Sequence, residues 1–86
     1  MHLHSVPRLA PGCRLHPTEP VLLVPEGTLN LAGPAPDILA QLDGTRSVEA
    51  IVGRLLEQYS GAPKDEMTQD VLSLLDRMEQ RGVVRC

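Results

Sequence analysis

Short apolar runs in the first third of the chain predict strands. Residues 21–24, Val-Leu-Leu-Val, form a continuous apolar run that is typical of a well-buried strand. The turn Pro25-Glu26-Gly27 follows, and polar and apolar residues then alternate over residues 28–31. The pattern predicts a hairpin with a half-exposed second strand. Residues 13–17 add a short edge strand that ends at Pro17.

Apolar residues spaced three and four apart predict three helices in the rest of the chain. The first begins in the proline-rich segment 33–36 and ends at Asp43-Gly44. The second begins at Ser47, a suitable N-cap, and its apolar positions continue to Tyr59. The third covers about residues 64–81 and ends at Gly82, with one apolar stripe formed by Met67, Val71, Leu74, Leu75 and Met78. Val83-Val84 either returns as a short strand or packs as coil.

This order of elements predicts an α+β fold. A small N-terminal antiparallel β-sheet of about three strands precedes three α-helices, in a winged helix-turn-helix-like arrangement. The chain has 86 residues, which is enough for one domain with a modest core. Residues 1–12 contain Pro7, Pro11 and Gly12, and we expect them to form a flexible N-terminal arm. Residues 13–86 then form a single domain.

Charge and composition argue against a nucleic acid or a membrane as partner. The net charge is -3. The third predicted helix contains three basic and five acidic residues, so it would repel the phosphates of a nucleic acid. Tyr59 is the only aromatic residue, so bases find no stacking platform. No apolar run approaches the roughly 20 residues of a membrane span, and residues 1–12 lack the apolar core of a signal peptide. We therefore expect a cytoplasmic protein.

The polar residues predict neither catalysis nor a metal or cofactor site. No serine–histidine–aspartate pattern, glycine-rich phosphate loop or paired carboxylates stand out, so we expect no catalytic residues and no enzyme activity. The histidines and the two cysteines lack the Cys-x-x-Cys or His-x-x-x-His spacing of a zinc site. Cys13 and Cys86 are expected to remain reduced in the cytoplasm.

Binding of a polypeptide is the function that these patterns leave. An alternating strand beside a helix with a widened apolar stripe can accept an extended peptide as an added strand. We predict that Thr28, Leu29, Asn30 and Leu31 pair with the peptide. The predicted wall of the groove is formed by Val71, Leu72, Leu75 and Met78. Leu72 lies at the margin of the stripe, and its spacing fits either the core or the groove.

Three segments of the chain strongly resemble one protein family. They are "PEG", "DILAQLDGTRSVEAIV" and the closing "QRGVV", and the resemblance to the coenzyme PQQ synthesis protein D (PqqD) family covers roughly residues 7–85. It implies a peptide-recognition domain with no catalytic residues of its own. Such a domain binds the ribosomally made precursor peptide PqqA between the third strand and the third helix. It presents that peptide to PqqE, a radical SAM enzyme of pyrroloquinoline quinone biosynthesis.

The sequence departs from this family pattern in two places. Family members commonly carry Leu-Asn where this chain has Leu31-Ala32, so Pro34 and Pro36 are expected to fix the start of the first helix. Members also often carry aromatic residues at the positions of Cys13 and Val24, which predicts a thinner core around the first strands.

A second class of function remains open at this point. The same elements fit a winged-helix adaptor or dimerisation module without a precursor peptide. A neighbouring gene for a short peptide with a Glu-x-x-x-Tyr motif, next to a radical SAM protein, would distinguish the two functions. The proline-punctuated arm ahead of thin strands also predicts a possible homodimer formed by exchange of N-terminal strands.

Overall fold

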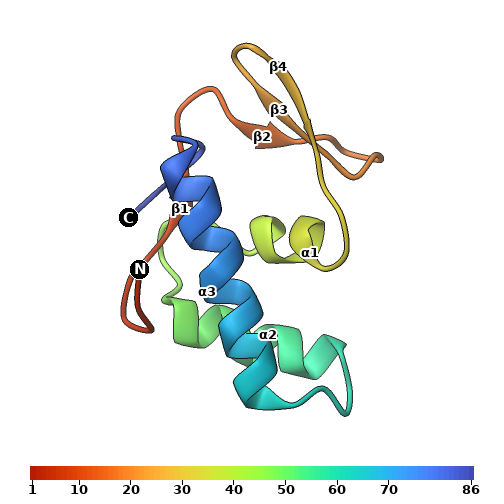
Figure 1. The fold of residues 1–86 in the computed structure, drawn as a ribbon, viewed down its shortest axis with the longest axis vertical. Helices are drawn as coiled ribbons and strands as arrows, with labels where there is room; N and C mark the ends of the chain where they lie inside the picture. The colour runs from red at the N-terminus through yellow and green to blue at the C-terminus, as the bar shows by residue number, and fades with distance from the viewer.

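A three-stranded antiparallel sheet forms one end of the molecule (Figure 1). The computed structural model describes residues 1–86. The strand order of this sheet is β2-β3-β4. Its strands are β2 (Arg14–Leu15), β3 (Val21–Val24) and β4 (Gly27–Asn30). Val24 pairs with Gly27, so a two-residue loop closes the hairpin. Gly27 has a φ of 145°, which L side chains rarely adopt, and this explains the glycine at that position. The three-stranded sheet that the sequence predicted is confirmed.

A second, two-stranded ribbon joins the two ends of the chain. Strand β1, Arg8–Leu9, pairs antiparallel with β5, Val84–Arg85, and both termini therefore lie on the same side of the molecule (Figure 1). The backbone N–H of Ala10 donates to the carbonyl of Val83 at 2.9 Å. Val84 of β5, the partner of Leu9, is 1% exposed and belongs to the core. Of the two alternatives for Val83-Val84, the return strand is the one observed.

The N-terminal arm, residues 1–12, packs against the rest of the chain. Pro7 is fully buried, and Ala10 is 4% exposed. The carbonyls of Ser5 and Leu3 accept the N–H groups of Val48 and Glu49, the first two residues of a helix, at 2.9 and 3.0 Å. These donors lack partners inside a helix, so the arm completes the start of that helix. The structure thus shows the arm docked on the domain, and its flexibility stays a prediction.

Three helices follow the sheet, as the sequence predicted. They are α1 (Ala35–Ala40), α2 (Val48–Gln58) and α3 (Lys64–Gln80), and none is long and apolar enough to cross a membrane. Pro34 is the N-cap of α1 and makes no side-chain capping bond, so proline geometry fixes this helix start. Ser47 caps α2 by accepting the N–H of Ala50 at 3.2 Å. The α+β arrangement of a small antiparallel sheet and three helices is confirmed.

The core lies where the three helices meet the sheet (Figure 1). Burial of these apolar side chains is the main driving force for the fold. Cys13 and Val24, the positions at which aromatic residues were expected, are only partly buried against this cluster. The cluster consists of Leu22, Leu31, Ala35, Ile38, Leu39, Val48, Ile51, Val52, Leu55, Met67, Val71, Leu74, Leu75, Met78, Val83 and Val84.

A polar network fixes α1 against α2. Gln41 is 8% exposed, and its Oε1 accepts from Arg54 Nε at 2.9 Å and from Arg46 Nη1 at 3.3 Å. A buried amide needs such partners, because an unsatisfied polar group in a core is costly. Arg46 of the "LDGTRSV" segment and Arg54 of α2 thus provide the hydrogen-bond donors that the buried Gln41 needs.

The loop between α1 and α2 is organised by Asp43. Its carboxylate accepts the N–H of Thr45 at 2.8 Å, the hydroxyl of Thr45 at 2.8 Å and the N–H of Arg46 at 3.1 Å. Hydrogen bonds to the charged form lower a carboxyl pKa. The backbone bond from Thr45 is the largest cause, and it helps to lower the pKa of Asp43 from 3.8 to about 2.

We expect a titration of the Asp43 carboxyl, followed by NMR, to give this low pKa. The loop is then stabilised by ionised Asp43 above pH 3.8, and this contribution is lost as the pH falls toward about 2. Thr45→Val removes the hydroxyl bond and keeps the backbone bond, so it should raise the pKa part of the way. A value near 3.8 in the unmodified protein would contradict the loop structure.

Candidate peptide-binding groove

Strand β4 presents an open edge of the three-stranded sheet. β3 is its only sheet neighbour, and the N–H of Leu31 donates to the carbonyl of Pro20 at 2.8 Å. Inter-strand bonds alternate along an antiparallel pair, so Gly27 and Leu29 also point their backbone groups toward β3. The backbone N–H and C=O groups of Thr28 and Asn30 therefore point toward the free edge. Both residues are exposed.

The segment directly after α3 lies opposite the first half of β4. A cavity of about 280 Å³ separates them, lined by Thr28 and Leu29 on one side and by Arg81 and Val83 on the other. Val24 and Glu26 of the hairpin close its outer end. An extended peptide that pairs with β4 would pass over this cavity.

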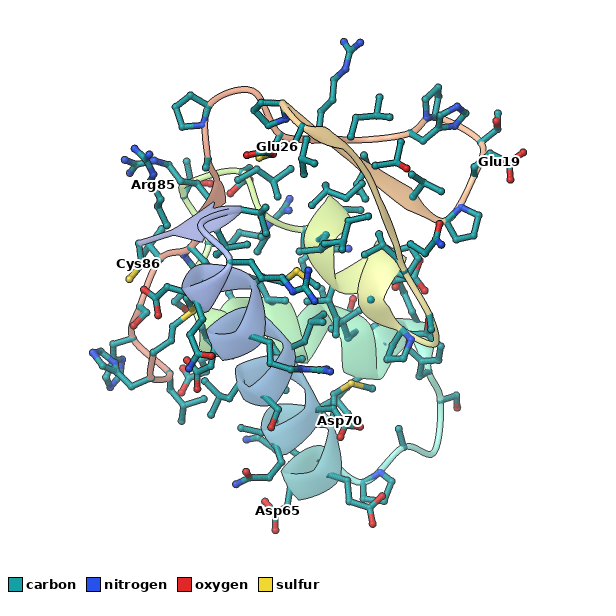
Figure 2. All side chains as sticks on the ribbon, turned by 45° about the horizontal axis from the view of Figure 1, so that its top comes forward. Glu19, Glu26, Asp65, Asp70, Arg85 and Cys86 are labelled. Carbon is teal, nitrogen blue, oxygen red and sulfur yellow. The ribbon has the colours of Figure 1, made fainter.

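The groove continues past the end of β4 toward the start of α3. A second cavity, of about 270 Å³, lies between the segment that leads into α1 and one face of α3. Its α3 residues are Asp70, Ser73, Leu74 and Arg77. Since β4 runs toward α1 while α3 runs toward the hairpin, the two walls are antiparallel to each other. Figure 2 shows Glu26 and Asp70 toward the opposite ends of this groove.

A third, more apolar cavity of about 410 Å³ forms the far end of the groove. Pro34, Tyr59, Ala62, Met67 and Asp70 line it together with a glycine. Tyr59 is 37% exposed, and its hydroxyl donates to Asp37 of α1. This bond raises the pKa of Tyr59, because the carboxylate favours the protonated phenol. The ring is thus held at the mouth of the cavity.

The predicted strand residues divide into an open pair and a packed pair. Thr28 and Asn30 are exposed with outward-facing backbone groups, as described above. Leu29 is half-buried and pairs with the fully buried Leu22. Leu31 lies just beyond β4, is 8% exposed and belongs to the core. The structure brings Thr28 and Leu29 to the groove directly.

The predicted wall residues of α3 lie elsewhere. Val71 and Leu75 are fully buried, and Met78 is 8% exposed, so these three residues form the core. Leu72 is half-buried and lies about 200° round the helix from Leu74, away from the groove. The wall is instead the neighbouring face of α3, which carries Asp70, Ser73, Leu74 and Arg77, continued by the C-cap residue Arg81.

Sequence reasoning missed this face because its residues are mostly polar. Asp70, Ser73 and Arg77 are exposed and resemble an ordinary solvated helix surface. Their one distinguishing signal is spacing, since Asp70 and Arg77 lie four residues before and three after the buried Leu74. The other flank of the stripe has the same kind of spacing. Only the position of β4 selects between the two flanks.

Comparison with known proteins places the chain in a family. A family model described as Coenzyme PQQ synthesis protein D (PqqD) matches residues 19–84. The chain belongs to the PqqD family. The matched residues include β3, β4 and all three helices, and thus nearly the whole groove.

Relatives of the chain in the PqqD family have names that refer to binding. The "PqqA binding protein" of Azotobacter vinelandii is 39% identical over 85 residues, which cover 93% of this chain and 89% of that protein. The "PqqA binding protein" of Pseudomonas aeruginosa strain UCBPP-PA14 is 40% identical over 79 residues, covering 86% and 83%.

A solved structure of the PqqD family has the same fold. It is the solution NMR structure of the PqqD truncation of Methylobacterium extorquens PqqCD, and it is described as a functional, stand-alone recognition element for ribosomally synthesised and post-translationally modified peptides. The two chains share 31% identity with a TM-score of 0.83, over 99% of this chain and 94% of the other.

Proposed function

We propose that this protein is a non-catalytic peptide chaperone of pyrroloquinoline quinone biosynthesis. It binds the precursor peptide PqqA as an added strand on β4, next to α3. Membership of the PqqD family and relatives named as PqqA binding proteins support the partner. The relative described as a recognition element supports a binding role without chemistry.

The open edge of β4 is the observation that carries this function. Thr28 and Asn30 offer two donors and two acceptors to a guest strand, and alternating main-chain bonds give affinity in strand addition. The cavities beside α3 lie where alternate side chains of that guest would point. The edge of β4 can thus pair with the backbone of the peptide, and the cavities on the same side of the molecule can select its side chains.

Delivery of the bound peptide to the radical SAM enzyme PqqE is the second step of the proposal. A peptide held by one strand edge keeps its other edge and its flanking residues free for a second protein. The proposed function also includes a possible homodimer, in which β1 leaves β5 of its own chain and pairs with β5 of a second copy.

A set of N-methylated PqqA peptides tests the strand addition. Each peptide carries one N-methyl group, which removes one backbone donor and leaves the side chain unchanged. We expect affinity to fall at every second position within one short segment, since only alternate N–H groups of an added strand face β4. Isothermal titration calorimetry gives the dissociation constants.

The control is the same set of peptides with the methyl group outside that segment. A uniform loss at consecutive positions would contradict an added strand and favour a bound helix. Absence of binding by the unmodified peptide would remove the precursor-peptide function and leave the adaptor or dimerisation module as the alternative.

A further inference from the structure

The α3 wall of the groove carries charges of opposite sign at its two ends. Asp70 lines the cavities near Tyr59 and the start of α1. Arg77 lines the cavity between α3 and the segment that leads into α1, which it shares with Asp70, whereas Arg81 lines the cavity next to the first residues of β4, which it shares with Glu26. All three side chains are exposed. A peptide bound in the groove thus meets the carboxylate of Asp70 at one end, the guanidinium group of Arg77 further along α3, and the guanidinium group of Arg81 together with Glu26 at the other end.

These charges have no partners within the protein. The structure has two ion pairs, one between the N-terminal ammonium group and Asp76 and the other between Arg46 and Asp43. Arg77 and Arg81 belong to neither, and they lie four residues apart on one helix face. Like charges at that spacing destabilise a helix. Cations interact favourably with the C-terminal end of a helix, and this interaction offsets the repulsion between the two arginines. The fold therefore engages neither guanidinium group in an ion pair, and both are available to a ligand.

We propose that this charge pattern fixes the direction and register of the guest peptide. An acidic residue of the guest lies against Arg81, beside Thr28, or against Arg77, one helix turn earlier. An uncharged or basic residue lies at the Asp70 end. This inference rests on the proposed strand addition at β4 and adds to it the charge that the groove selects.

Helix geometry sets the spacing of the selected residues. Asp70 and Arg81 are eleven residues apart, which is about 16 Å along the axis of α3 at 1.5 Å per residue. An extended peptide advances about 3.3 Å per residue, so the two ends of the groove lie about five guest residues apart. Arg77 is seven residues from Asp70, which corresponds to about three guest residues. An acidic guest residue is thus expected three to five positions from the residue at Asp70.

Guanidinium groups suit this role because of their geometry. Each can donate two parallel N–H bonds to a carboxylate, which gives direction as well as energy. The alternating bonds of β4 hold a guest strand in either direction and in registers two residues apart. A charge contact at one end removes this ambiguity, since a reversed guest would place its carboxylate beside Asp70.

Charge reversal at the groove tests the inference. The probe is the PqqA precursor peptide together with its single Asp→Asn and Glu→Gln variants, titrated at low and at physiological salt. We expect Arg77→Glu and Arg81→Glu each to weaken binding of the unmodified peptide by about tenfold at low salt, and by less at high salt. One acidic position of the peptide should lose affinity similarly when neutralised.

Rescue and a matched control separate a specific contact from a general field. A peptide with lysine at that acidic position should bind Arg81→Glu more tightly than the unmodified peptide does. Lys64→Glu makes the same change of charge on the same helix but lines a different cavity, beside Leu3 and Leu56, so it should leave the affinity within about twofold. Arg81→Gln, which removes the charge without reversing it, provides the measurement if Arg81→Glu does not fold.

The possible outcomes separate the two proposals. Unchanged affinity in both arginine variants, or an equal loss in Lys64→Glu, would overturn the charge selection while the strand addition stands. The same holds if no single acidic position of the peptide couples to Arg77 or Arg81. Failure of the unmodified protein to bind the unmodified peptide would overturn the proposed function itself.

Discussion

Replacing Leu75 with alanine is expected to lower the free energy of unfolding by about 2–5 kcal/mol, the range for a buried leucine truncated to alanine. Leu75 is fully buried in the cluster where α3 meets α2 and the sheet, so the shorter side chain leaves a cavity there. A small domain has little stability in reserve, and this loss is a large part of its total. Urea denaturation measures it.

Leu72→Ala is the matched control on the same helix. Leu72 is half-buried and lies outside the groove, so we expect a loss of about 1 kcal/mol and an unchanged affinity for the precursor peptide. If Leu72 formed the wall of the groove, as the sequence predicted, this substitution would weaken binding instead. A clear loss of affinity in folded Leu72→Ala would restore the predicted wall and contradict the groove described above.

Local sequence signals predicted the elements of this fold well. The run Val21–Val24 is a strand, and Gly27, which follows the two-residue loop, adopts the positive φ that favours glycine. Ser47 caps α2 through its side chain. Each of these features depends on residues close together in the chain, which is why spacing and residue type were sufficient.

Contacts between distant segments were harder to predict. Strand β1 pairs with β5, joining Arg8 to Arg85, and two residues per strand leave no alternating pattern to read. Pro7 looked like a residue of a mobile arm, yet it is fully buried. Prolines mark places where the chain cannot form regular hydrogen bonds, and this property fits both a loose arm and a docked one.

The sequence predicted the edge strand of the candidate groove but not the face of α3 that lines it. The alternation around Thr28 and Asn30 identified an edge strand, because a half-exposed strand has this pattern. On α3 the apolar stripe marked the core, and the groove lies on its polar flank, which includes Arg77. A helix periodicity shows which face is buried. It does not show which flank of that face lies next to another element.

Removal of residues 1–10 is the second change with a large expected effect. The truncated chain loses β1, the buried Pro7 and Ala10, and the acceptors for Val48 and Glu49 at the start of α2. Each lost hydrogen bond costs about 1 kcal/mol, and the buried Val84 loses its strand partner Leu9. We expect the free energy of unfolding to fall by about 2–4 kcal/mol.

The matched control is His4→Ala, which changes an exposed side chain of the same arm and keeps its backbone. It should leave the denaturation midpoint almost unchanged. If the truncated chain is as stable as the full chain, the arm is not docked in solution.

Light scattering on both chains adds a test of strand exchange. A dimer held by exchanged β1 strands requires those residues, so the truncated chain should then be monomeric at concentrations where the full chain is dimeric.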